Sequence, residues 1–303
     1  MTILHNANIE LHVHPFFPKN TLADVVGAMD KRGLDVVALE LLDASLYRDV
    51  IEQASIYFSG FLADTTGVRL PNGKFILNAR EYNTKEELHV LTIGHTMNEA
   101  SPLTDIRKII DESLENGALV ILDHPFVDNF KTRTAGHITS DQEIALMKLC
   151  KEYSGEVALE WNAYCIPWMR AGLRHFLNND LVRKGMKSAF DFGYGQIFYH
   201  DVNKRAIQLS EHLMAQGYNV PMVADTDLHA RDKNDLMVMG TSRVITDINT
   251  ITPADVVASM KNNIFQGNYT NRRRYVSAFH LLGSFCFPVI MPGRYESPRA
   301  EGS

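Results

Sequence analysis

Cysteine is scarce in this chain of 303 residues: only Cys150, Cys165 and Cys286 occur, and no two of them form a CxxC unit. This spacing indicates free thiols in a reducing compartment. The chain also lacks an apolar run of the ~18 residues that a membrane span requires. Its N-terminus has no basic region followed by an apolar run, so no signal peptide is expected. We therefore expect a cytoplasmic protein without a membrane partner.

Positive charge is also limited, because 30 Lys and Arg residues stand against 36 Asp and Glu residues, for a net charge of −6. No basic stripe with interleaved aromatic residues is present, so we expect no nucleic-acid partner. The short basic run 272–274 is interpreted as a solvated turn. A hydrophobic content of 45% is ordinary for a globular protein.

Short apolar runs alternate with amphipathic stretches, which favours a parallel sheet covered by helices. The predicted strands are 9–14, 35–42, 74–81, 88–94, 118–122, 157–161, 220–224 and 244–246. The predicted helices are 22–32, 48–58, 103–115, 138–153, 203–216 and 253–261, with two further pieces in 168–187. A closed barrel fits better than an open sheet, because the candidate ligands follow most of the strands and a barrel gathers strand ends at one mouth. We expect one barrel domain over 1–285 and a C-terminal tail over 286–303.

The first predicted strand ends in His12-x-His14, and side chains two apart on a strand share a face. Two neutral imidazoles on one face can bind one metal ion. Further residues of ligand type lie at or beside the ends of later predicted strands: Glu81, His89, His124, Asp227 and His229. Together they predict a metal cluster at the mouth, in which Glu81 can bridge two cations through its two oxygens.

The segments that carry these residues resemble the motifs of the PHP family, the polymerase and histidinol phosphatase domains. They are Glu10-Leu-His-Val-His-Pro15, Asn78-Ala-Arg-Glu81 with Leu88–Gly94, Leu122-Asp-His-Pro125, Glu160-Trp-Asn162 and Asp225-Thr-Asp-Leu-His229. The resemblance spans roughly residues 9 to 270, with the motifs in the family's order. It implies a distorted (β/α)7 TIM-like barrel and metal-dependent hydrolysis of phosphoesters.

The resemblance also implies a ligand set for two divalent ions. The implied first site uses His12, His14, Glu81 and Asp227, and the implied second site uses Glu81, His89 and His124. Mixed histidine and carboxylate ligands suit zinc, manganese and iron, so the sequence selects none of them.

The chain departs from the family at the third metal site, of which only His229 is retained. Lys19 stands where relatives carry Asp or His, and Glu40-Leu41-Leu42 stands where they carry Thr-Asp-His. Lys19 could supply part of the missing positive charge as a point cation. Arg231 is a second candidate cation for the substrate, and Glu40 is either a ligand or an acceptor for a histidine N–H.

The favoured hypothesis is a two-metal phosphoesterase acting on a small phosphorylated metabolite or nucleotide. We expect Asp227, His229 and Lys19 to act in catalysis, and Lys19, Arg231 and His229 to contact the substrate. One alternative is a C–N hydrolase of the amidohydrolase kind, which would carry a bridging lysine. Others are a degenerate barrel that binds metal or phosphate as a regulator, and an exonuclease, which the acidic charge disfavours. His5, His95 and His137 are further candidates for substrate contact, and the oligomeric state is not predicted.

Overall fold

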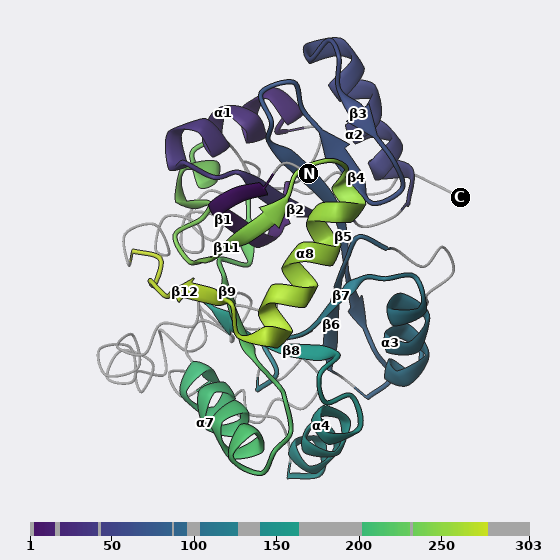
Figure 1. Cartoon of the computed structure of the whole chain (residues 1–303), viewed down its shortest axis with the longest axis vertical. Helices are drawn as coiled ribbons and strands as arrows, with labels where there is room; N and C mark the ends of the chain where they lie inside the picture. The colour runs from purple at the N-terminus through teal and green to yellow at the C-terminus, as the bar shows by residue number, and fades with distance from the viewer. Residues whose placement is uncertain are drawn as a thin grey trace, which may run out of the picture.

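The strands of the chain form a nearly closed barrel with helices on its outside, a distorted TIM-like architecture (Figure 1). The computed structural model describes residues 3–15, 19–41, 44–86, 88–95, 104–126, 140–163, 202–230 and 233–277. The predicted helices in 168–187 and the predicted tail 286–303 lie outside this part of the chain. Within it, no helix is long and apolar enough to cross a membrane.

The predicted elements are present, with ends that differ by a few residues. The strands are β1 Ile3–His14, β2 Val36–Glu40, β3 Leu62–Ala63, β4 Gly67–Arg69, β5 Phe75–Asn83, β6 His89–Ile93, β7 Leu119–Asp123, β8 Val157–Asn162, β9 Met222–Asp225, β10 Leu228–His229, β11 Arg243–Asn249 and β12 Tyr269–Arg272. The helices are α1 Leu22–Arg32, α2 Ala44–Tyr57, α3 Ile106–Glu115, α4 Ser140–Glu152, α7 Val202–Ala215 and α8 Pro253–Gln266, with the 3₁₀ helix η2 Asp235–Val238. Arg272 closes β12, so its interpretation as part of a turn was wrong.

The sheet is mixed, and the expectation of a parallel sheet was wrong for several strands. The order of the strands is β12-β11-β1-β2-β5-β6-β7-β8-β9. The short strand β10, which follows β9 in the chain, pairs with β1 and so brings the last part of the barrel next to the first. β6 is antiparallel to both β5 and β7. The five-residue link 84–88 between β5 and β6 is too short for a parallel crossover. As a result, the first residue of β6, His89, lies beside the last residues of its neighbours, Asn83 and Asp123.

Apolar side chains fill one end of the barrel. Alternate residues of the strands, among them Ile9, Leu77, Leu91 and Ile121, form one buried cluster. Residues of α8 join this cluster, because α8 lies against the barrel (Figure 1). A capping box at Thr252 begins α8. The other face of the strands packs against α1, α3, α4 and α7 in a second cluster.

An irregularity in β1 turns its two histidines into the barrel. Between Glu10 and Val13, β1 contains one residue more than the paired stretch of β2. Leu11 on one side of this bulge belongs to the inner cluster and Val13 on the other side to the outer cluster. A β-bulge re-aims the side chains that follow it. His12 and His14 therefore continue the inner row that begins with apolar residues.

The buried Glu10 side chain holds the bulge against the segment after η2. Its oxygens accept hydrogen bonds from the backbone N–H groups of Thr226 at 2.9 Å, Gly240 at 2.7 Å and His12 at 3.4 Å. The Thr226 hydroxyl donates a further bond at 2.5 Å. Burial raises the pKa of Glu10 to about 7, although these hydrogen bonds lower it. The bulge is thus positioned by contacts far apart in the sequence.

Substitution of Gly240, whose N–H donates to Glu10, is expected to destabilise the fold. Gly240 has φ +67°, and an added Cβ would lie 2.6 Å from the Leu34 side chain, which is fully buried. Gly240→Ala should lower the free energy of unfolding by about 2–4 kcal/mol, from left-handed strain and overpacking. Gly217 has φ +88° with open space around its Cα, so Gly217→Ala should cost only about 1 kcal/mol. Urea unfolding of both variants checks the difference, and equal losses would contradict this account.

Candidate metal centre

At one end of the barrel the inner rows of seven strands change from apolar to ionisable side chains. The residues at these inner positions are His12 and His14 of β1, Glu40 of β2, Glu81 of β5, His89 of β6, Asp123 of β7, Glu160 of β8 and Asp225 of β9. His124 and Asp227 follow in turns with positive φ, +24° and +49°. Such backbone conformations in residues other than glycine are concentrated at functional sites. This end of the barrel is the mouth that the sequence predicted.

The first group of side chains surrounds one oxygen of Glu81. His12 Nε2 and His14 Nε2 lie 3.9 and 3.8 Å from Glu81 Oε2. His14 Nε2 also lies 3.4 Å from Asp227 Oδ1. Ligand atoms about 2.1 Å from a tetrahedral ion stand roughly 3.4 Å apart, so these separations suit one shared cation.

The second group surrounds the other oxygen of Glu81. His124 Nε2 lies 3.4 Å from Glu81 Oε1, and His89 Nδ1 contacts the same oxygen. Burial opposes ionisation of Glu81, but the charges on His89 and His124 outweigh it and hold the pKa of this carboxyl well below its usual range. The structure therefore brings the six predicted ligands together, with two histidines beside each oxygen of Glu81 and with Asp227 beside His14.

The cluster has the properties of a divalent-metal site. His12 is fully buried, and its Nε2 has no hydrogen-bond partner among the described residues. Both carboxylate oxygens of Asp123 and of Asp225 also lack a hydrogen-bond partner among the described residues. Buried charged groups left in this state are costly unless a cation or a proton compensates them. Several imidazole and carboxylate groups in such an arrangement fit divalent cations.

Glu40 has the geometry of an acceptor for a histidine N–H. Its Oε2 lies 3.0 Å from His14 Nδ1, and the distances above place the other ring nitrogen of His14 toward Glu81 and Asp227. A carboxylate on the far nitrogen fixes the tautomer and orientation of a ligating imidazole. Of the two roles open to Glu40 from sequence, the contacts match this second one.

Three buried acids in the cluster were not predicted as site residues: Asp123, Glu160 and Asp225. Glu160 Oε1 lies 3.4 Å from His12 Nδ1, and Glu160 Oε2 accepts a 2.6 Å bond from the His124 backbone N–H. The alternation of β8 could have identified Glu160, because it shares a face with Ala158 of the inner cluster. Asp123 ends an otherwise apolar strand, and that change of residue type was the available signal.

The buried acids also shift one another's pKa values. Burial raises the pKa of Asp123 and Asp225 well above the usual range, and the negative charge of Glu160 raises both further. Burial lowers the basicity of His124, but the Asp123 and Glu81 carboxylates outweigh it and raise the pKa of His124 to about 10. A cation that binds here must therefore displace protons.

The remaining predicted residues have different positions. His229 lies beside the first group, with Nδ1 3.3 Å from the Asp227 carbonyl oxygen and a side chain that is 44% exposed. Lys19 is exposed, in the loop after β1. Arg231 lies outside the described residues, so its predicted substrate contact has no structural description.

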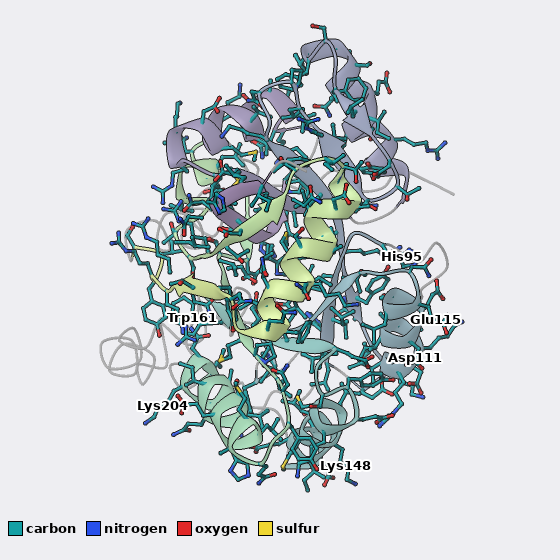
Figure 2. All side chains as sticks on the ribbon, in the orientation of Figure 1. His95, Asp111, Glu115, Lys148, Trp161 and Lys204 are labelled. Atoms are coloured by element: carbon teal, nitrogen blue, oxygen red, sulfur yellow. The ribbon has the colours of Figure 1, made fainter. Side chains whose placement is uncertain are left out.

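Two of the further histidine candidates are at the wrong end of the barrel. His5 lies near the start of β1, 2.9 Å from Asp247. His95 follows the end of the antiparallel β6 and lies 3.6 Å from Glu112 of α3 (Figure 2). Both are far along their strands from the ligand residues His14 and His89, so neither candidate lies at the mouth. His137 lies outside the described residues.

Known protein structures share this architecture. No family model matches the chain, and no curated protein matches it in sequence. The crystal structure of PsfC from Pseudomonas syringae PB-5123 superposes with a TM-score of 0.54, at 14% identity, over 95% of this chain and 100% of that one. A two-domain protein from Bacteroides vulgatus with a predicted PHP-like metal-dependent phosphoesterase superposes with a TM-score of 0.51, at 13% identity, over 94% of this chain and 69% of that one. The fold is PHP-like. The expected distorted TIM-like barrel is thereby confirmed.

A further neighbour corrects the expectation that no nucleic acid is a partner. Endonuclease Q, solved with a 27-mer duplex substrate that carries an abasic lesion at the active site, superposes with a TM-score of 0.46, at 13% identity, and this chain spans 58% of its length. That enzyme was solved with a duplex substrate, so the exclusion of nucleic acid was wrong. The prediction relied on the net charge of −6, which is a sum over the whole chain and does not describe the charge at the mouth. Cations bound at a mouth can neutralise phosphates locally without a basic stripe.

Proposed function

We propose that this chain is a metal-dependent phosphoesterase that uses two divalent ions. The observation that supports this proposal is the division of ligands about Glu81, with His12 and His14 at one oxygen and His89 and His124 at the other. A shared carboxylate of this kind is suited to ions about 3.5–4 Å apart. The first ion would be held by His12, His14, Glu81 and Asp227, and the second by Glu81, His89 and His124.

The reaction would combine the chemistry of the ions with that of nearby side chains. Bound ions would generate a nucleophile near neutral pH and neutralise charge on the phosphate. His229 is the most exposed side chain of the cluster at 44%, and its Nδ1 is directed to the Asp227 carbonyl. The carbonyl acceptor requires a proton on Nδ1, so Nε2 would give a proton to the leaving oxygen only from the charged ring. Desolvation and the charge of His14 lower the pKa of His229 to about 4, so the charge of a bound phosphate would have to favour that form. Glu40 would keep His14 oriented toward the first ion.

The proposed substrate class is a phosphate ester of a metabolite or nucleotide. The alternative C–N hydrolase is less well supported, because no inner row of the described strands ends in a lysine and Glu81 fills the bridging position.

A screen of the manganese-loaded protein against phosphomonoesters, phosphodiesters, nucleotides and a duplex oligonucleotide tests the proposal. We expect turnover of at least one phosphate ester and its loss on chelation. Full metal loading without any such turnover would contradict the proposal and favour a regulator, whereas turnover of amides alone would favour the C–N hydrolase.

Lys19 is the proposed cation for the substrate phosphate. The neighbouring Asn20 is buried and donates hydrogen bonds to the carbonyls of Pro15 at 2.7 Å and Ala230 at 2.5 Å. The Ala230 N–H in turn donates to the His14 carbonyl at 2.9 Å. The loop that carries Lys19 is therefore tied to the segment after His229 at the mouth.

Lys19→Ala should lower kcat/KM by about 10²-fold, about 2.7 kcal/mol, which is the scale of one lost electrostatic contact to the transition state. Metal content should not change, because the residue is proposed to contact the phosphate and not the ions. Lys31→Ala, at an exposed position near the end of α1, is the matched control and should retain full activity. Unchanged kinetics in Lys19→Ala would show that this lysine is only a solvated surface residue.

A further inference from the structure

Asp123, the last residue of β7, stands between the two groups of ligands. Its side chain is fully buried. Oδ2 lies 3.3 Å from His124 Nε2, and Oδ1 lies 3.5 Å from His12 Nδ1. Neither oxygen accepts a hydrogen bond from a described residue. A fully buried carboxylate with no such bond is expected to have another partner.

The position of Asp123 matches that of a ligand in the second group. Asp123 is directly opposite His89 in the antiparallel pair of β6 and β7. Ligand-type atoms of Asp123, Glu81, His89 and His124 all lie within 4.8 Å of one another. His124 Nε2 is almost equally far from Asp123 Oδ2 and Glu81 Oε1, at 3.3 and 3.4 Å. These separations are those of atoms around a single cation.

A purely supporting role for Asp123 accounts less well for these contacts. In that role, Asp123 would accept the N–H of His12 Nδ1 and share a proton with Glu160. Glu160 Oε1 already lies 3.4 Å from the same nitrogen, slightly closer than Asp123 Oδ1. A single N–H has one strong acceptor at a time. The His12 ring can thus be oriented by Glu160, which leaves Asp123 Oδ2 directed to the second group.

We infer that Asp123 is a fourth protein ligand of the second divalent ion. This inference rests on the proposed two-metal function and deepens it. Both sites then have the same donor set, two imidazoles and two carboxylates, with Glu81 shared. A tetrahedral zinc ion with four protein ligands has no open position for a substrate. Manganese and iron accept additional ligands, so both four-ligand sites should favour these ions in the active protein.

Metal binding to the full chain tests the assignment independently of activity. The protein is stripped with a chelator and dialysed against increasing Mn²⁺, and bound manganese is measured by elemental analysis and electron paramagnetic resonance. The wild type should bind two coupled ions. At concentrations that load the wild type, Asp123→Asn should bind one manganese ion. Its affinity for the second ion should fall by at least about 10²-fold. Glu160→Gln is the matched control: it removes the other acid beside His12 and should retain two ions at saturation.

The outcomes separate this inference from the function on which it rests. If the wild type binds no metal, the proposed function fails. If Asp123→Asn binds two ions with wild-type affinity, or loses both, the assignment of Asp123 to the second site is overturned. Asp123→Glu guards against a folding defect, because it retains a carboxylate and should recover the second ion. Equal binding by the Asn and Glu variants would also overturn the inference.

Discussion

Glu81→Gln is expected to abolish loading of both sites and to lower kcat/KM by at least about 10⁴-fold, about 5.4 kcal/mol. One carboxylate serves both groups, since Oε2 faces His12 and His14 while Oε1 faces His89 and His124. A glutamine has a single acceptor oxygen, so its NH₂ group must face one of the two sites. Both sites also lose the negative charge that attracts a cation. Elemental analysis should find less than one ion per chain under conditions that load the wild type with two.

Glu40→Gln provides the matched control for this variant. It removes the same charge from the adjacent strand β2, but from a side chain that contacts the far nitrogen of His14. Loss of such an acceptor typically lowers metal affinity or activity by 10–100-fold. Two ions should therefore still bind at saturating concentration. A Glu81→Gln protein that retains two ions would show that this residue does not bridge the sites.

Asp227→Asn is expected to remove the first ion selectively and to lower kcat/KM by at least about 10³-fold, about 4.1 kcal/mol. Asp227 Oδ2 accepts a 2.8 Å hydrogen bond from Asn162 Nδ2, while Oδ1 lies 3.4 Å from His14 Nε2. In the variant, the amide oxygen should keep the bond with Asn162, which places the NH₂ group where the cation binds. Stability should change little, because the apolar barrel core is at the other end of the strands.

Asp225→Asn is the comparison for this prediction. Asp225 is fully buried, and burial together with the charge of Glu160 raises its pKa well above the usual range. Asp225 groups with Glu160 beside His12 and with neither Glu81 nor Asp227, so the substitution should preserve both ions. Metal content and steady-state kinetics of the two variants check the contrast. If Asp227→Asn keeps full activity and Asp225→Asn loses it, the ligand was assigned to the wrong acid of the motif.

The sequence predicted the parts of this centre that depend on local pattern. His12-x-His14 requires only a strand, and helices α1 and α8 begin at their predicted first residues, Leu22 and Pro253. The direction of β6 was not predicted, because an apolar run such as Leu88–Gly94 has the same appearance in either direction. That reversal decides that His89 is at the mouth and His95 is at the opposite end.

The supporting residues could not be predicted because they depend on pairing between distant strands. Glu40 meets His14 only through the register of β1 and β2, and that register includes the bulge after Glu10. Asp123 and Glu160 reach the cluster through the pairing of β7 with β6 and β8. The next residue, Trp161, belongs to the outer face of β8, and its ring centroid lies 4.9 Å from that of Tyr275.

The central claim is that one carboxylate joins two metal sites at the mouth of the barrel. Anomalous diffraction from crystals of the manganese-loaded protein tests it most directly, because each ion gives its own peak. The account predicts two peaks about 3.5 Å apart, one on either side of the Glu81 carboxylate. Three strong peaks, or two ions with Glu81 turned away from them, would contradict it.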